Sequence, residues 1–151
     1  MGVLFLGDKT GVKHINIRCF KKCVAVLINQ NGKKLNSLNY VFINDDELLE
    51  LNRQFLKHNT YTDIVTFDLS SNKLQIEAEI YISLDRVKEN AIKFKTNTTD
   101  ELLRVMFHGV LHLFGLKDKS ALEKTNMRQA EADCLNLYRE TLSAVSHENK
   151  Q

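Results

Sequence analysis

The 151-residue sequence contains no proline, where average usage of about 5% would give roughly seven. This absence removes a common marker of loops and helix ends, so boundaries must be inferred from glycine, capping residues and hydrophobic periodicity. Cysteine is also scarce, with three residues and no C-x-x-C pair. That count argues against a disulfide framework and a cysteine-based zinc knuckle, and it favours a reducing compartment. We expect the three cysteines to pack in the core.

Long apolar runs are missing too. No stretch approaches the roughly 18 apolar residues of a membrane span. The N-terminal run VLFL has four residues and no basic segment before it, which is unlike a signal peptide. Leu6 stands where a myristoylation signal requires Ser or Thr. We therefore expect a cytoplasmic protein.

Runs of five or more like charges are absent, and the charged residues are spread along the chain. The net charge of +2 and the pI of 8.4 permit a polyanionic partner without requiring one. The length fits one domain over residues 1–151, and 43% hydrophobic residues is close to the globular average. Such a chain can bury a core without disulfide bonds.

Hydrophobic periodicity divides the chain into strands and helices. Alternating or β-branched residues predict strands over 12–20, 38–44, 62–69 and 76–83. Helical spacing predicts helices over 20–29, 45–57, 85–94, 98–114 and from 120 onward, with a frayed tail at 143–151. We expect an α+β (mixed α/β) fold in which about five helices pack on a small four-stranded sheet.

Capping residues delimit the two C-terminal helices. Thr98 with Glu101 and Ser120 with Glu123 have the spacing of a capping box. Gly115 is expected to end the first of these helices, because glycine readily adopts the left-handed conformation at a helix C-terminus. That helix is apolar nearly all round, which predicts a central, buried position.

The central helix carries a motif typical of metal sites. His108 and His112 are four residues apart, so both imidazoles lie on one helix face and can reach one ion. Gly115 would then turn the chain and bring back Asp118, giving H-x-x-x-H-x-x-G-x-x-D. Three protein ligands with a fourth position open to water is the arrangement of catalytic zinc. The alternatives are two buried core histidines and an ordinary loop aspartate.

The residue after the first histidine separates two kinds of hydrolase. Zinc proteases with this histidine spacing have Glu there, whereas this chain has Gly109, which cannot accept a proton. The general base is therefore unassigned, and we expect a metal-bound water as the nucleophile. Phosphodiesters suit such a site because a metal can neutralise the charge that develops in their transition state.

The stretch HGVLHLFGLKD resembles the signature H-G-x-L-H-L-x-G-Y-D-H of the YbeY family of bacterial rRNA-maturation endoribonucleases. The segment 51–69 resembles the family's LN…TDVLSF, and AEIYIS at 78–83 is similar to its GDIxIS strand. Glu123, Met127 and Glu131 match the E-x-x-x-M-x-x-x-E pattern.

The resemblance implies a mixed sheet, one Zn²⁺ per chain and cleavage of single-stranded RNA. It further implies a role in 16S rRNA 3′-end maturation and ribosome quality control, with rRNA precursor, the small ribosomal subunit and assembly factors as partners. Another divalent metal is the alternative to zinc, because Asp118 replaces the family's third histidine and aspartate is a harder ligand.

The family's RNA-contacting Arg corresponds here to Leu56. Lys57 and His58 are the predicted replacement contacts, with Arg53 as a further candidate; a solvated helix end is the alternative for each. Asp63 is expected to cap its strand, and a carboxylate near the site is the alternative.

Three functions remain open from the sequence. The first is a metal-dependent endoribonuclease with His108, His112 and Asp118 as ligands. The second is a non-catalytic ribosome-assembly or RNA-binding factor whose metal is structural. The third is a zinc metalloprotease, which Gly109 disfavours.

Overall fold

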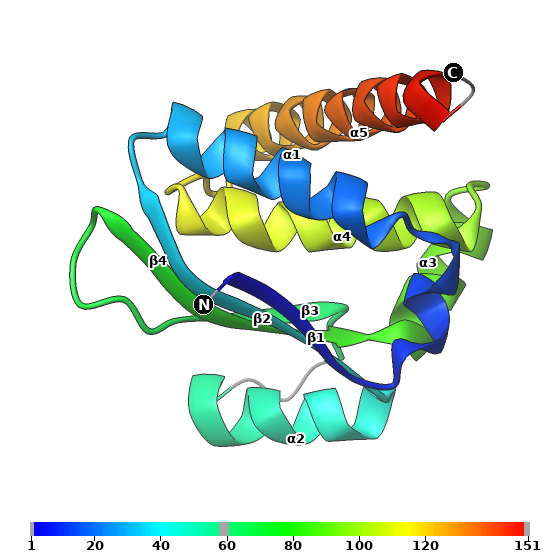
Figure 1. The fold of residues 1–151 in the computed structure, drawn as a ribbon. Coiled ribbons are helices and arrows are strands. Elements are labelled where there is room, and N and C mark those ends of the chain that lie inside the picture. Colours follow the sequence, from blue (N-terminus) through cyan, green and yellow to red (C-terminus); the bar gives the residue numbers. More distant parts are fainter. Residues whose placement is uncertain (1, 58–60, 150–151) are drawn as a thin grey trace.

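A computed structural model of the chain describes residues 2–57 and 61–149 (Figure 1). Its four-stranded sheet has the order β1-β2-β4-β3, with β1 parallel to β2, β2 parallel to β4, and β3 antiparallel to β4. The strands are β1 (Gly2–Gly7), β2 (Lys34–Ile43), β3 (Ile64–Asp68) and β4 (Gln75–Ser83). This mixed sheet confirms the predicted fold class.

Five α-helices and one 3-10 helix are found in the described residues. They are η1 (Lys9–His14), α1 (Ile17–Gln30), α2 (Asp45–Leu56), α3 (Leu84–Lys93), α4 (Thr98–Leu113) and α5 (Ala121–Asn149). Figure 1 shows α4 between the sheet and the outer pair α1 and α5, while α2 covers the opposite face of the sheet. None of these described helices has the length and apolarity needed to cross a membrane.

The N-terminal part of the chain differs from the prediction. The strand predicted over 12–20 is wrong, because η1 and the start of α1 occupy these residues. The Asn16 side chain accepts a hydrogen bond of 3.0 Å from the Cys19 backbone N–H, which caps α1 and favours helix over strand. The first strand is instead β1, which pairs in parallel with the distant β2.

The α4 boundaries fit the prediction except at the cap. The predicted Thr98–Glu101 capping box is wrong, because Asn97 is the N-cap and its side chain accepts from the Asp100 backbone N–H at 2.8 Å. Asn at this position satisfies one of the free N–H groups of the first turn, and Thr98 becomes the first helical residue.

The last helix begins as predicted. Ser120 and Glu123 form a reciprocal capping box, with hydrogen bonds of 2.9 and 3.1 Å. The helix then continues to Asn149, through most of the 143–151 segment predicted to fray; fraying itself stays a prediction.

The core lies between the sheet and the helices α1, α4 and α5. All three cysteines, Cys19, Cys23 and Cys134, are buried and free, as predicted. The α4 helix is buried along most of its length, from Leu102 to Leu111, which confirms its predicted central position. Because α4 is held on both sides, the side chains at its C-terminal end have a fixed place.

Candidate metal centre

The two histidines project from the last turns of α4. The helix ends at Leu113, and Gly115 follows with a φ of +96°. Residues with a side chain rarely adopt this φ, whereas glycine adopts it readily. The Gly115 backbone N–H donates to the His112 carbonyl at 2.9 Å. This turn reverses the chain and brings Asp118 back to the helix, as the spacing predicts.

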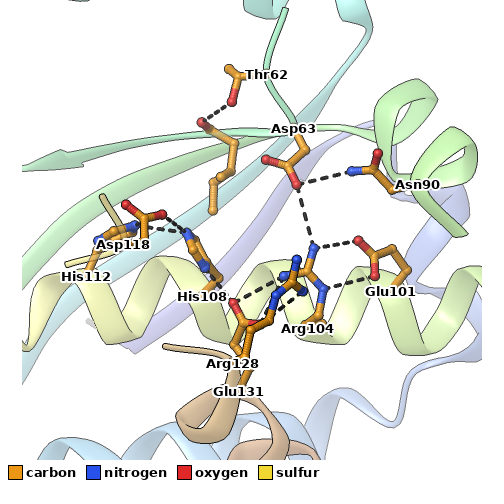
Figure 2. A network of polar contacts seen from close by, with 11 residues as sticks. Thr62, Asp63, Asn90, Glu101, Arg104, His108, His112, Asp118, Arg128 and Glu131 are labelled. Carbon is orange, nitrogen blue, oxygen red and sulfur yellow. Dashed lines mark hydrogen bonds and ion pairs between the residues drawn. The ribbon is translucent and has the colours of Figure 1, made fainter. Parts of the chain in front are cut away.

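The three predicted ligand residues meet at one point (Figure 2). One Asp118 carboxylate oxygen, Oδ2, lies 3.2 Å from His108 Nε2 and 3.3 Å from His112 Nε2. The two Nε2 atoms are 2.9 Å apart. His108, His112 and Asp118 form the only group of three or more metal-binding side chains found within the described part of the chain.

The other ring nitrogen of each histidine is held by a hydrogen-bond acceptor. His112 Nδ1 lies 2.8 Å from the Leu116 carbonyl oxygen, and His108 Nδ1 lies 2.6 Å from Glu131 Oε2. A carbonyl oxygen only accepts, so His112 Nδ1 must carry the proton. An ionised Glu131 likewise accepts from His108. Both neutral rings therefore direct an Nε2 lone pair at Asp118.

This donor set fits a divalent metal. The two Nε2 atoms and Asp118 Oδ2 lie within 3.3 Å of one another. With both protons on Nδ1, no hydrogen atom lies between the two Nε2 atoms, so their lone pairs repel each other and the carboxylate unless a cation binds. In a tetrahedral zinc site with bonds of about 2.0–2.1 Å, neighbouring ligand atoms are about 3.3 Å apart. Ligating histidines also commonly donate their second N–H to a carboxylate or carbonyl. The residues His108, His112 and Asp118 could thus hold a metal ion.

Arg104 ties Glu131 to the rest of α4. Its guanidinium lies 3.1 Å from both Glu131 oxygens and 2.6 Å from Glu101 Oε2 (Figure 2). Both glutamates are 2% exposed. Burial opposes the charge of Arg104, but the hydrogen bonds that it donates to Glu101 and Glu131, and the negative charges of both, outweigh burial and raise the pKa of Arg104. The result is a buried ion-pair network directly behind His108.

The electrostatics keep Glu131 ionised. Burial alone would raise its pKa, but the hydrogen bond from His108 and the charge of Arg104 outweigh burial and lower the pKa of Glu131 below its ordinary value. An ionised carboxylate is the stronger acceptor for the His108 Nδ1–H.

Asp63 also faces this network. Its carboxylate lies 3.4 Å from Asn90 Nδ2 and 3.9 Å from Arg104 (Figure 2). Burial raises the pKa of Asp63, and the positive charge of Arg104 only partly offsets this effect. Asp63 directly precedes β3, and its strand-capping role stays a prediction.

Gly109 stands where zinc proteases with this histidine spacing have glutamate. A Cβ atom at this position would lie 2.8 Å from Ile80 Cδ1 and 3.0 Å from Ile64 Cδ1. Position 109 thus faces Ile64 of β3 and Ile80 of β4. The glycine allows α4 to approach the sheet closely.

A hollow of about 390 Å³ opens over the histidines. Among the described residues, its lining includes neither Lys nor Arg. The lining residues are Leu56, Thr62, Asp63, Ile64, Val65, Thr66, Asp68, His108, His112, Leu113 and Asp118.

Comparison with known proteins places this chain in a family. The family model described as "Endoribonuclease YbeY" matches residues 8–139, which includes the whole histidine cluster. The chain belongs to the YbeY family of endoribonucleases.

YbeY relatives match over most of the chain. The protein named Endoribonuclease YbeY from Porphyromonas gingivalis W83 is 39% identical over 140 residues, 93% of this chain and 92% of its own. The one from Cytophaga hutchinsonii is 53% identical over 100 residues, 66% of this chain and 70% of its own. The solution structure of TM1509 from Thermotoga maritima aligns with a TM-score of 0.63 and 27% identity, covering 91% of this chain and 92% of that one.

Sequence reasoning missed the ion-pair network behind His108 in this YbeY chain. The family pattern includes Glu131 without giving it a role, Glu101 enters the sequence analysis only as a capping-box residue, and Arg104 is not singled out there. An i,i+3 pair of opposite charges, Glu101 and Arg104, inside an otherwise apolar helix is the signal that could have found them.

Of the two predicted RNA contacts, the structure describes only Lys57. Lys57 is the C-cap of α2 and exposed, and it does not line the hollow, although its neighbour Leu56 does. His58 lies outside the described residues.

Proposed function

We propose that this chain is a zinc-dependent endoribonuclease that cleaves single-stranded RNA during 16S rRNA 3′-end maturation and ribosome quality control. The carrying observation is that His108, His112 and Asp118 present three acceptor atoms to one point, in a chain of an endoribonuclease family. The rRNA precursor, the small ribosomal subunit and assembly factors are its partners in this proposal, and the cytoplasm is its location.

The chain's own groups would act as follows. His108 Nε2, His112 Nε2 and Asp118 Oδ2 hold the ion. A bound zinc ion supplies Lewis acidity and a coordinated water whose pKa is about 7. Glu131 and the Leu116 carbonyl fix the two imidazole rings through their Nδ1–H groups. This preorganisation leaves both Nε2 lone pairs aimed at the ion before substrate arrives.

RNA contacts at Lys57 and His58 remain part of this proposal. Lys57 is exposed at the end of α2, one residue beyond Leu56, which lines the hollow. An ammonium group there can reach a phosphate as a point charge, without the bidentate geometry of Arg.

Proteolysis is disfavoured by the packing of α4. The Cβ of a protease-type glutamate at position 109 would lie 2.8 Å from Ile80 Cδ1 and 3.0 Å from Ile64 Cδ1, so these side chains would have to shift to admit it. Asp63 is on the pocket side, but it belongs to the ion-pair network around Arg104.

The rival is a non-catalytic RNA-binding factor with a structural metal. A structural zinc site usually closes all four positions with protein ligands. Here three converge from the described residues, which favours a catalytic site. Melting with and without a chelator, alongside RNA cleavage assays, separates the two: a large stability loss with no cleavage under any metal supports the rival.

The direct test is cleavage of an rRNA precursor fragment by purified zinc-loaded protein. We expect His112→Ala to abolish cleavage, and EDTA to abolish wild-type cleavage until zinc is restored. His14→Ala is the matched control, because His14 is exposed in η1 and away from the cluster. Undiminished cleavage by His112→Ala at the same purity contradicts the proposed function.

A further inference from the structure

Three hollows adjoin one another across the metal centre. The central hollow over the histidines shares His108 and Asp118 with a second one of about 280 Å³, on the α5 side. It shares Asp68 and Leu113 with a third one of about 420 Å³, beside the β3–β4 loop. The shared residues make one track with the histidine cluster in its middle segment.

Among the described residues that line this track, Lys and Arg occur only at its two ends. The central hollow is lined by acids, threonines and apolar side chains besides the two histidines. The α5-side hollow is lined by Arg104, Lys124 and Arg128, and the loop-side hollow by Lys33 and Lys73. This distribution matches a polyanion whose backbone is held on both sides of a reacting group.

The α5 end presents two exposed cations. Lys124 and Arg128 are four residues apart on one face of α5, and Met127 beside them is 2% exposed and forms the floor. The Lys124 ammonium group has no ion pair with any side chain in the described ranges, whereas the Arg128 guanidinium lies 3.5 Å from Glu131 Oε1 (Figure 2).

Arg104 has a different part in this hollow. Its guanidinium is committed to Glu101 and Glu131, so it does not supply a free charge. Lys124 and Arg128 are therefore the groups that can reach a phosphate next to the metal centre.

The loop end is polar as well as positive. The Lys33 ammonium group donates to the Lys73 carbonyl oxygen, which draws the segment before β2 to the β3–β4 loop. Ser70, Ser71 and Asn72 line the same hollow and offer hydroxyl and amide groups. These are common partners of phosphate and sugar oxygens.

We propose that a single RNA strand lies along this track, with Lys124 and Arg128 contacting phosphate on one side of the scissile bond and Lys33 and Lys73 contacting phosphate on the other. The proposal rests on the proposed function. The nucleotide at the scissile bond would occupy the central hollow, against its threonines and apolar side chains. Such contacts to the backbone hold any sequence and supply affinity rather than base specificity.

The test is binding of a fluorescent single-stranded oligouridylate to zinc-loaded protein across a salt series. We expect the double variants Lys124→Gln/Arg128→Gln and Lys33→Gln/Lys73→Gln each to weaken binding about tenfold at 0.1 M salt. The slope of log K against log salt should fall by about 0.7 for each phosphate that the variant no longer neutralises. Arg18→Gln/Lys22→Gln on α1 removes the same charge from exposed positions outside all three hollows and should change affinity less than about twofold.

The outcomes separate this proposal from the proposed function. If wild type cleaves RNA and both track variants bind like the Arg18/Lys22 control, the track is wrong while the nuclease function stands. If the zinc-loaded wild type neither binds nor cleaves RNA, both the track and the proposed nuclease function are contradicted. Circular dichroism melting of each variant confirms that weakened binding does not come from unfolding.

Discussion

Glu131 Oε2 lies 2.6 Å from His108 Nδ1, although the two residues belong to different helices and are 23 positions apart. The contact fixes one histidine of the candidate metal centre by a buried carboxylate that Arg104 keeps ionised. The packing of α4 against α5 therefore helps to set the direction of a metal-binding lone pair. A substitution on α5 should change the metal affinity.

Glu131→Gln should lower zinc affinity about 10- to 100-fold, because an amide is a weaker acceptor for the His108 Nδ1–H and no longer fixes the ring. Competition with a chromophoric chelator measures the change. Glu140→Gln, an exposed α5 residue, should leave zinc affinity unaltered. Wild-type affinity in Glu131→Gln would show that the contact does not orient His108.

Asp118→Ala should lose zinc affinity by at least about 100-fold, since it removes a ligand and not merely a supporting group. Asp118→His should retain the metal, because imidazole is also a zinc ligand. Metal content of the purified proteins and chelator competition measure both.

The control for Asp118 is Asp68→Ala. Asp68 lines the same hollow, but its carboxylate bonds to Ser70 at 2.6 and 3.0 Å and lies outside the ligand cluster. Full metal occupancy in Asp118→Ala would remove Asp118 from the ligand set.

The sequence was most informative where the structure is local. His108, His112, Gly115 and Asp118 lie within eleven consecutive residues, and helix geometry with one glycine turn is enough to bring them together. Their convergence could therefore be predicted from spacing.

Features that depend on distant partners were not predictable in the same way. The contact of Glu131 with His108 depends on how α5 packs against α4, which no local pattern encodes. The strand β1 exists because it pairs with β2, more than thirty residues later in the chain. Around Ile15 the alternation of apolar and polar residues suits a strand, but the Asn16 cap decides for helix.

Arg104→Met should destabilise the metal-free protein by about 3–5 kcal/mol, because it leaves Glu101 and Glu131 buried without their shared cation. Urea unfolding in the presence of EDTA measures this cost separately from metal binding. Adding Glu101→Gln should recover part of the loss, since one unpaired carboxylate is then removed. Strictly additive costs of the two substitutions would mean that the network is not coupled.

Asp63→Asn should raise the free energy of unfolding at pH 7. Burial raises the pKa of Asp63 above its ordinary 3.8, so the folded chain binds more protons than the unfolded chain between 3.8 and the raised value. Stability therefore falls as pH rises through that window, and the asparagine variant avoids this loss. The gain should vanish below pH 3.8, where Asp63 is protonated in both states.

Paired melts of wild type and Asp63→Asn at neutral and acidic pH test this sign. Asp133→Asn on the exposed side of α5 controls for the general loss of one negative charge. A stability gain that is the same at both pH values, or equal to that of Asp133→Asn, would contradict the burial argument.

Gly109→Ala should destabilise the fold by about 1–3 kcal/mol, although alanine favours helix over glycine by about 1 kcal/mol. The new Cβ would lie 2.8 Å from Ile80 Cδ1, closer than packed carbons approach. Ile80→Val deletes this Cδ1 atom and by itself costs about 0.5–1.5 kcal/mol. In the double variant the alanine methyl can occupy the vacated space, so the combined cost should be smaller than the sum of the two. Chemical denaturation of wild type, the two single variants and the double variant measures the four free energies of unfolding. If the two costs simply add, the contact between α4 and β4 is not the reason that position 109 requires glycine.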